Sequence, residues 1–349
     1  MKKIVVIMML AFTLALSACG KTKDSNGTSN ETNTTKNSQG YKILEQPEGK
    51  LPTILLYEKD GVTLTLSEPD PELLKKTEAE KGKRFERAGM LTLENKKDIT
   101  VGIGYAELYI NRIQTDENIL ELSAEKGKTE TLILDLTPYK NVILNEEKSL
   151  LENGEIYSIT FQTSIVDINA GWVPFDRFNY YIPMKEEEKQ QAFLDQFTTE
   201  EKLCFENDVL AIYFMERYYD PQRDHESERK QKYYEFIIKN KTDQYLSFGD
   251  NDETPSIVGT KNIKNMRWPF GGIEAGNYMI DYLILDKVDD NDDPIMHYDE
   301  MKQAYVYELY DMFDGEEVTS GEFEFIFKPG DFGLETTSTK EETYYKLYK

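Results

Sequence analysis

Alternation of apolar and polar residues along short stretches is the feature that most narrows the folds open to this chain. In the clearest stretches, apolar residues recur mostly at every second position: 62–66, 132–136, 157–165 and 322–327. A period of two places successive side chains on opposite faces of a strand. Short strands of this kind, separated by turn residues, predict an all-β fold built as a sandwich or a small barrel.

An internal repeat indicates that the strands form two similar units. Three pairs of segments match in the same order, at spacings of 148, 145 and 149 residues: Leu55–Asp60 with Leu203–Asp208, Glu94–Asp98 with Lys239–Asp243, and Glu125–Lys128 with Glu274–Asn277. Solenoid repeats are much shorter than this, so the spacing indicates a duplicated domain. In each copy, the Asn-Lys-Thr/Lys-Asp string predicts a turn made by Asx-type hydrogen bonds, and Gly127 and Gly276 allow a tight turn.

Each copy resembles a family of immunoglobulin-like domains found in surface lipoproteins of Gram-positive bacteria. The matching parts are 91–98, 127–136 and 157–165 in the first copy, and 236–243, 276–285 and 323–327 in the second. Where the second copy has Val258-Gly259, the first has Ile110-Asn111. The resemblance implies two tandem immunoglobulin-like β-sandwiches. It implies no settled activity and no catalytic residues.

The N-terminus predicts export and lipidation. A basic start precedes an apolar run of 15 residues, Ile4–Ala18, which is shorter than the roughly 20 residues of a membrane-spanning helix and typical of a signal peptide. Its end, Leu16-Ser17-Ala18-Cys19-Gly20, resembles the lipobox of bacterial lipoproteins. That resemblance implies cleavage before Cys19 and a lipid on its thiol, which would anchor the chain to the outer face of the cell membrane. An ordinary secretory signal is the alternative.

These signals divide the chain into six parts. They are a signal peptide (1–18), a lipidated cysteine with a disordered tether (19–40), a first sandwich (41–184), an inter-domain segment (185–202), a second sandwich (203–330) and a C-terminal tail (331–349). The tether is rich in Asn, Thr, Ser, Gly and Lys, which cannot bury enough apolar surface to fold. The inter-domain segment has helical spacing at Phe193 and Phe197, and is either a stiff spacer or a flexible linker.

Charge and composition exclude several classes of function. The chain carries 41 Lys and Arg against 65 Asp and Glu, a formal net charge of −24. This balance argues against nucleic-acid binding, which requires a basic face, and against electrostatic docking on anionic lipid. A basic protein partner would instead be favoured in its association rate.

The sequence contains no recognisable catalytic motif. Its two histidines, His225 and His297, lie in polar loops without a nucleophile motif nearby. Cys204 is expected to be a buried small hydrophobe, with a reactive thiol as the alternative. We therefore expect a protein that is not an enzyme; a hydrolase with an unfamiliar site is the remaining enzymatic alternative.

Acidic runs offer oxygen ligands for a hard cation such as Ca²⁺. The denser run contains Asp289, Asp290, Asp292 and Asp293, and a second run spans Asp250–Glu253. Neither has the spacing of an EF-hand loop. Because carboxylate runs in loops usually serve solubility, we expect no cofactor, with Ca²⁺ at the first run as the alternative.

The two tryptophans are the candidate contact residues. Trp172 lies in Trp-Val-Pro-Phe and Trp268 in Trp-Pro-Phe-Gly-Gly. Exposed aromatic side chains stack on sugars or anchor protein partners, whereas buried ones fill a core. The expected function is non-catalytic recognition or scaffolding, with an unknown protein or glycan partner; a carbohydrate-binding module is the alternative.

Overall fold

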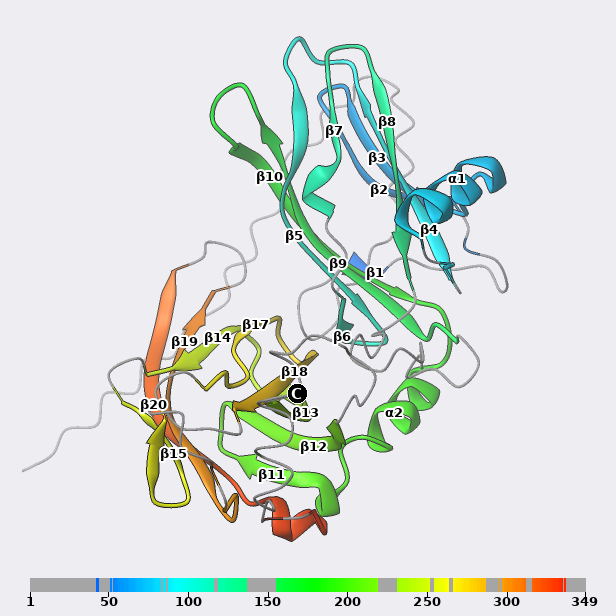
Figure 1. The fold of residues 1–349 in the computed structure, drawn as a ribbon. Coiled ribbons are helices and arrows are strands. Elements are labelled where there is room, and N and C mark those ends of the chain that lie inside the picture. Colours follow the sequence, from blue (N-terminus) through cyan, green and yellow to red (C-terminus); the bar gives the residue numbers. More distant parts are fainter. Residues whose placement is uncertain are drawn as a thin grey trace, which may run out of the picture. The chain divides into compact units, whose positions relative to one another are not determined.

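The structure is a computed structural model whose described residues form an all-β protein, as predicted (Figure 1). They are residues 42–43, 51, 53–82, 84–85, 87–115, 119–136, 155–218, 231–251, 254–263, 266–286, 295, 297–311, 316–334 and 336. Within this part of the chain, the α-helices are α1 (Pro71–Lys81) and α2 (Glu187–Asp195). Short 3₁₀ helices lie at Ile119–Glu121, Glu200–Lys202 and Pro329–Phe332.

In the N-terminal half, a four-stranded sheet has the order β2-β3-β4-β8. Its strands are β2 (Ile54–Lys59), β3 (Val62–Ser67), β4 (Ala88–Asn95) and β8 (Thr129–Asp135). It packs through a shared core against the strands β10-β9-β5 of a longer, ten-stranded sheet. These strands are β5 (Val101–Ile110), β9 (Ser158–Asp167) and β10 (Val173–Pro183), accompanied by the short β1 (Lys42–Ile43), β6 (Ile113–Gln114) and β7 (Ser123–Ala124).

The C-terminal half repeats both strand orders: β11-β12-β13-β18 corresponds to β2-β3-β4-β8, and β20-β19-β14 corresponds to β10-β9-β5. The path β11-β12-β13-β18 continues the ten-stranded sheet, and a six-stranded sheet packs against it through a second core. The first path contains β11 (Leu203–Glu206), β12 (Leu210–Tyr218), β13 (Gln231–Asn240) and β18 (Tyr278–Asp286). The six-stranded sheet contains β14 (Tyr245–Asp250), β15 (Ser256–Val258), β16 (Lys261–Ile263), β17 (Gly271–Ile273), β19 (Met301–Tyr310) and β20 (Glu317–Phe327).

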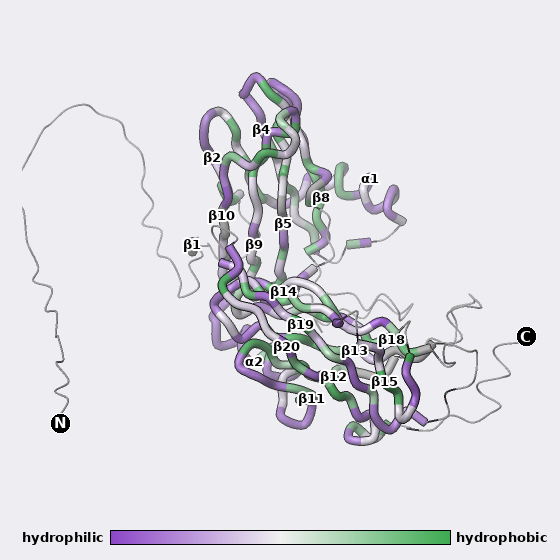
Figure 2. The backbone as a smooth tube through the Cα atoms, turned by 90° about the vertical axis from the view of Figure 1, so that its left-hand side faces the viewer, coloured by the Kyte–Doolittle hydropathy of each residue, from purple (hydrophilic) through white to green (hydrophobic). Residues whose placement is uncertain are grey.

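Alternating burial along the strands explains why this sequence forms sheets. Val62, Leu64 and Leu66 of β3 are completely buried, while the threonines between them are only partly buried. Hydrophobic and hydrophilic residues also alternate along several other strands (Figure 2). Burying one face of each sheet is the main favourable contribution to the stability of such a layer.

The predicted inter-domain helix exists and is packed. α2 covers Glu187–Asp195 of the 185–202 segment, and its Phe193 and Leu194 are buried with Ile237 and Tyr278 in a small third cluster. The backbone N–H of Tyr278 donates to the carbonyl of Arg112 at 2.8 Å, where β18 meets β6. The segment is therefore a packed helix and not a flexible linker.

In each half, a buried asparagine side chain holds the predicted Asn-Lys-Thr/Lys-Asp turn in place through hydrogen bonds. The Asn95 Nδ2 donates to the carbonyls of Ile99 at 2.7 Å and Ala124 at 2.9 Å, while its Oδ1 accepts from the N–H of Lys97 at 2.9 Å. One side chain therefore ties its own turn to the strand end at β7. Asn95 is completely buried, and its bond to Ala124 is shielded from water, while the bonds to Ile99 and Lys97 are partly buried.

Asn240 makes the same set of bonds in the second half. Its Nδ2 donates to Gln244 at 2.8 Å and Ile273 at 2.9 Å, and its Oδ1 accepts from the N–H of Thr242 at 2.9 Å. Asn240 is also completely buried. The three partners lie 145, 149 and 145 residues after those of Asn95, which are the spacings of the sequence repeat.

Asn111 of the first copy and Gly259 of the second, which the sequence comparison places at equivalent positions, have the same backbone conformation. Asn111 has a φ of 55° and Gly259 a φ of 59°, both in the left-handed region. Asparagine tolerates this region better than most residues. The buried Asn111 side chain also accepts from the N–H of Tyr157 at 2.6 Å and donates to the carbonyl of Glu155 at 3.0 Å.

Three expectations need correction. The alternating segments 157–165 and 323–327 are not equivalent, because β9 lies between β10 and β5, whereas β20 pairs only with β19 at a sheet edge. The helix α1 was not expected, although Asp70 caps it by accepting from the N–H groups of Glu72 and Leu73. The second core also extends past residue 330, since Phe332 packs 4.9 Å from the Phe214 ring.

Replacing Asn240 with alanine should destabilise the fold strongly. The substitution leaves the carbonyls of Gln244 and Ile273 and the N–H of Thr242 without their partner, at a cost of about 3 kcal/mol or more. Urea unfolding of the purified protein measures this loss. The matched control Asn262→Ala, at an exposed position, should change the free energy of unfolding by less than about 0.5 kcal/mol. Equal effects of the two substitutions would contradict this role of Asn240.

Candidate binding surfaces

Several predicted site residues lie outside the described part of the chain. These are the lipidation candidate Cys19, the loop histidine His225, and the Ca²⁺ candidates Asp289, Asp290, Asp292 and Asp293. His297 is described and exposed. Within the described ranges, no group of three or more His, Cys, Asp or Glu side chains could hold a metal ion.

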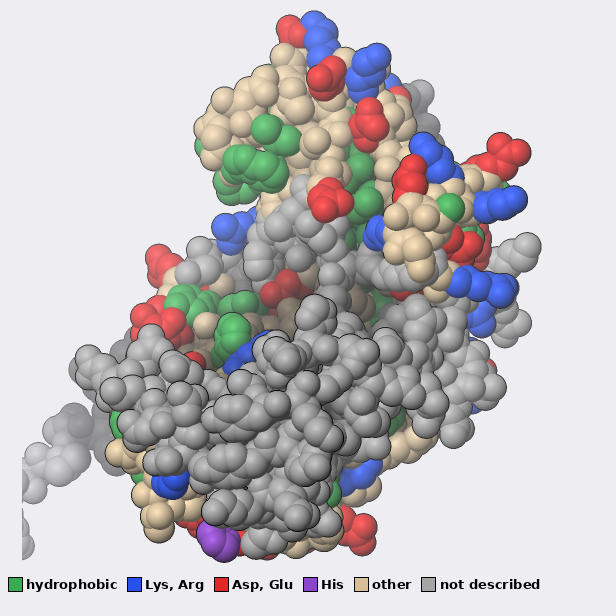
Figure 3. Space-filling model, in the orientation of Figure 1, with side chains coloured by type: hydrophobic (Ala, Val, Ile, Leu, Met, Phe, Trp, Pro, Cys, Tyr) green, Lys and Arg blue, Asp and Glu red, His purple; other side chains and the backbone are tan. Residues whose placement is uncertain are grey.

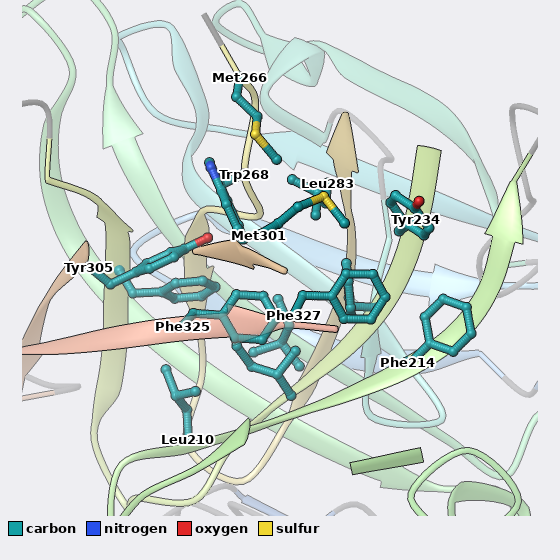
Figure 4. Packing of buried hydrophobic residues seen from close by; sticks show 14 of the residues in the cluster. Leu210, Phe214, Tyr234, Met266, Trp268, Leu283, Met301, Tyr305, Phe325 and Phe327 are labelled. Atoms are coloured by element: carbon teal, nitrogen blue, oxygen red, sulfur yellow. The ribbon is translucent and has the colours of Figure 1, made fainter. Parts of the chain in front are cut away.

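Trp268 is a core residue, so the alternative in which it contacts a partner is wrong. Its side chain is 1% exposed, and its Nε1 donates to the Ser256 Oγ at 2.7 Å. Its ring lies edge-on to Phe325 at 5.6 Å and to Tyr305 at 6.4 Å (Figure 4). The sequence string around it did not reveal this, because burial is set by β19 and β20, which lie far along the chain.

Trp172 is exposed at the tip of the β9–β10 hairpin. Residues 169–174, which we call the tip segment, are all exposed and include no charged side chain. Trp172 is 51% exposed and Val173 52%. Hydrophobic side chains gather on the surface at this hairpin (Figure 3). A contiguous exposed apolar patch on a protein surface commonly marks an interaction site.

Hydrogen bonds and packing hold the tip segment in place. The N–H of Ala170 donates to the Asp167 side chain at 3.1 Å, and the N–H of Gly171 donates to the Ile168 carbonyl at 3.1 Å. Just beyond the tip segment, Phe175 packs against the N-terminal core, with the Lys97 Nζ 4.4 Å from its ring centroid. The exposed indole is therefore presented by a structured turn.

A cavity of about 610 Å³ lies in the N-terminal half, beside α1. Its apolar lining includes Leu51, Leu74, Phe85, Leu136 and Met184. Leu51 precedes β2, Leu74 lies in α1 and Phe85 after it, and Leu136 and Met184 directly follow β8 and β10. Because no two of them are close in sequence, no local pattern could have predicted this cavity.

Charged side chains line the same cavity. Lys185 pairs with Glu155 at 2.7 Å between Nζ and Oε1, and this contact holds the pKa of Glu155 below its ordinary value. The Glu68 Oε1 accepts from the N–H of Leu51 at 2.9 Å. The fourth charged side chain is that of Arg87, which is exposed. The cavity is large enough for a small molecule, and its four charged side chains, two of each sign, give its lining no net charge.

Cys204 behaves as a small hydrophobe. Its side chain is partly buried and packs against the C-terminal core. Burial raises the pKa of its thiol to about 12, since desolvation disfavours the thiolate. This does not favour the alternative of a reactive thiol, which requires a lowered pKa.

The comparisons with known proteins do not identify a family. No protein-family model matches the sequence, and neither does any curated protein. A structure of the YadV chaperone is 10% identical, over 69% of this chain and 92% of its own, with a TM-score of 0.20. The CupB2 chaperone of Pseudomonas aeruginosa is 14% identical, over 68% and 92% of the two chains, with a TM-score of 0.16. Red sea bream transglutaminase is 8% identical, over 73% of this chain and 33% of its own, also at 0.16. Likenesses this weak carry no argument about function.

Membrane-spanning helices are a separate question. Among the helices that the structure describes, none combines the length and hydropathy needed to cross a bilayer.

The Cys204 thiol should react slowly with iodoacetamide at pH 8. With a pKa of about 12, its thiolate fraction there is on the order of a thousandfold smaller than that of an ordinary cysteine. The rate should rise about tenfold per pH unit up to the pKa, as long as the fold persists. Peptide mass spectrometry at Cys204 measures the rate, and unfolding in urea should restore ordinary reactivity. Rapid labelling of the folded protein would contradict the raised pKa.

Proposed function

We propose that this protein is a lipid-anchored, extracytoplasmic bacterial protein that recognises a protein partner through the tip of the β9–β10 hairpin. In this proposal its body consists of two tandem immunoglobulin-like sandwiches related by duplication, and its action is non-catalytic. The matching Asn95 and Asn240 networks and the repeated strand order support the duplication.

The observation that carries the proposal is the exposure of Trp172 on a structured turn. Tryptophan is enriched among residues that dominate binding energy at protein interfaces. Presentation by a hairpin that is already hydrogen-bonded reduces the entropy lost on binding. The absence of charge in the tip segment lets it lose water cheaply when a partner covers it.

The attachment point of the N-terminal chain supports an outward-facing tip. β1 pairs with β10 at Tyr180 and Tyr181, whereas the tip segment joins β10 at Val173. Seven residues of strand separate Val173 from Tyr180, which corresponds to about 23 Å at roughly 3.3 Å per residue. A tether that enters the fold at Lys42 therefore leaves the tip at the other end of the strand, free to meet a partner.

Glycan recognition is less well supported than protein recognition. An aromatic platform for a sugar was expected to draw on Trp172 and Trp268, and Trp268 is buried in the core. Trp172 would then have to stack on the sugar without the second tryptophan. The net charge of −24 additionally favours a basic protein partner over an acidic wall polymer.

A photo-crosslinking amino acid at position 172 should capture one defined protein on intact cells. The same reagent at Leu55, which is 49% exposed on β2, is the matched control and should capture none. With the captured partner purified, Trp172→Ala should weaken binding about tenfold or more, while Leu55→Ala leaves it unchanged. Equal affinity of the two variants would contradict the role of the tip, and capture of a glycan instead would favour the carbohydrate-binding alternative.

Replacing Cys19 with alanine should release the protein from the membrane or leave its signal peptide uncleaved. The reason is that two acyl chains on the thiol would supply the anchoring energy. Fractionation of cells with mass spectrometry of the N-terminus tests this, with Ser17→Ala as a control that is expected to be processed normally. Membrane retention of a processed Cys19→Ala protein would contradict lipid anchoring.

A further inference from the structure

The strand β20 forms one edge of the six-stranded sheet (Figure 1). Its register with β19 runs without interruption from Thr319 to Phe327. Among the strands that the structure describes, β20 pairs with β19 alone, and β11 of the facing sheet pairs with β12. An edge strand presents a row of unpaired N–H and C=O groups on which another strand can form.

The hydrogen bonds of β19 show which residues of β20 direct these groups outward. The Asn251 N–H donates to the Ala304 carbonyl at 2.8 Å, so the even-numbered residues of β19 bond toward β14. The odd-numbered residues of β19 therefore bond toward β20, where they lie opposite odd-numbered residues. The backbone groups of the even-numbered residues of β20 consequently point away from β19: Ser320, Glu322, Glu324 and Ile326.

The side chains along this edge are acidic. Glu322 and Glu324 are exposed, and within the described part of the chain neither has an ion-pair partner. The exposed Glu308 of β19 lies opposite Ser320 and adds a third carboxylate. The paired segments 304–310 and 317–324 contain no Lys or Arg.

Basic residues of these two strands lie at the other end of the edge. Lys302 of β19 lies opposite Ile326, and Lys328 directly follows β20. The Lys328 Nζ pairs with the Glu300 Oε2 at 3.3 Å, so its charge is compensated. The edge around Glu322 and Glu324 therefore keeps an uncompensated negative charge.

The face of β20 that points to the core is apolar. The Phe323 ring is partly buried, and its centroid lies 4.9 Å from that of Phe205 on β11 and 5.0 Å from that of Tyr305. Phe205 is also only partly buried. A strand added to β20 would place every second side chain on this face, where apolar groups would cover the remaining exposed area of both phenylalanines.

From these contacts we infer that β20 binds an extended segment of a protein partner in which basic and apolar residues alternate. The segment pairs antiparallel to β20, with basic side chains opposite Glu322 and Glu324 and an apolar one opposite Phe323. A second copy of this chain fits worse, because antiparallel pairing of β20 with itself about Phe323 places Glu322 opposite Glu324. This site is separate from the hairpin tip and does not depend on the proposed recognition through Trp172.

Two fluorescent peptides of opposite charge test the inference on the purified full-length protein. Lys-Val-Lys-Val-Lys-Val-Lys, with blocked ends, should bind. Glu-Val-Glu-Val-Glu-Val-Glu should bind about tenfold more weakly or not at all, because like charges directly opposite each other on paired strands are destabilising. Fluorescence anisotropy measures both affinities. Equal affinities, or no binding of the lysine peptide, would overturn the inference.

Backbone methylation distinguishes strand pairing from general attraction between opposite charges. In the antiparallel arrangement, the lysine N–H groups face β20 and the valine N–H groups face away from it. Methylating the nitrogens of the two central lysines should therefore weaken binding about tenfold or more, because hydrogen bonds to β20 are lost. Methylating two valine nitrogens should leave the affinity unchanged. Both peptides carry the same charge, so equal affinities would rule out pairing with β20.

Variants of β20 then locate the site. Glu324→Pro removes an outward N–H without removing a bond to β19, and should weaken the lysine peptide about tenfold or more. Glu322→Gln combined with Glu324→Gln keeps the backbone intact and should weaken it about fivefold or more. The matched control combines Glu200→Gln with Glu201→Gln, which removes the same charge at exposed positions, and should leave binding unchanged. Equal effects of the two glutamine pairs would place the peptide elsewhere and contradict the inference, whether or not the proline variant folds.

Discussion

Each half of this protein depends on one buried asparagine side chain. Asn95 and Asn240 each connect a tight turn to a strand that is more than 25 residues away along the chain, through bonds in which the amide donates twice and accepts at least once. A sheet without disulfides needs such a connection where a strand leaves one layer for the other, because the backbone groups at that corner have no neighbouring strand to bond. An amide serves better than a charged group there, since it satisfies both donors and acceptors without burying a net charge.

The two candidate binding features occupy opposite ends of the same pair of strands. The tip segment joins the end of β9 to the start of β10, while Ile156 and Met184 of the cavity lie just before β9 and just after β10. Ten residues of strand correspond to about 33 Å. Binding at one end therefore makes no contact with a ligand at the other, and the two features can be altered independently.

Local patterns in the sequence predicted those features of the fold that depend on residues close together in the chain. Alternation identified β3, β8 and β9, and the asparagine turn was recognised from its Asx-forming residues. The signals at the ends of α1 were equally local, with Asp70 before Pro71 and Gly82 after Lys81. The helix was nevertheless missed, because it has no apolar face that would produce a helical pattern of hydrophobic residues. By contrast, the cavity and the burial of Trp268 depend on packing between segments that are distant in the sequence. Neither composition nor spacing around either tryptophan distinguishes a core residue from a surface one.

The weak packing of α1 affects how this region moves. A helix of 11 residues is marginally stable by itself in water, and α1 gains no fully buried side chain from the sheets it lies beside. Its amide protons are therefore expected to exchange with solvent through local opening, far faster than those of β3 or β9 at the centre of their sheets. The N-terminal half thus combines a rigid sandwich with one wall that can open without disturbing it.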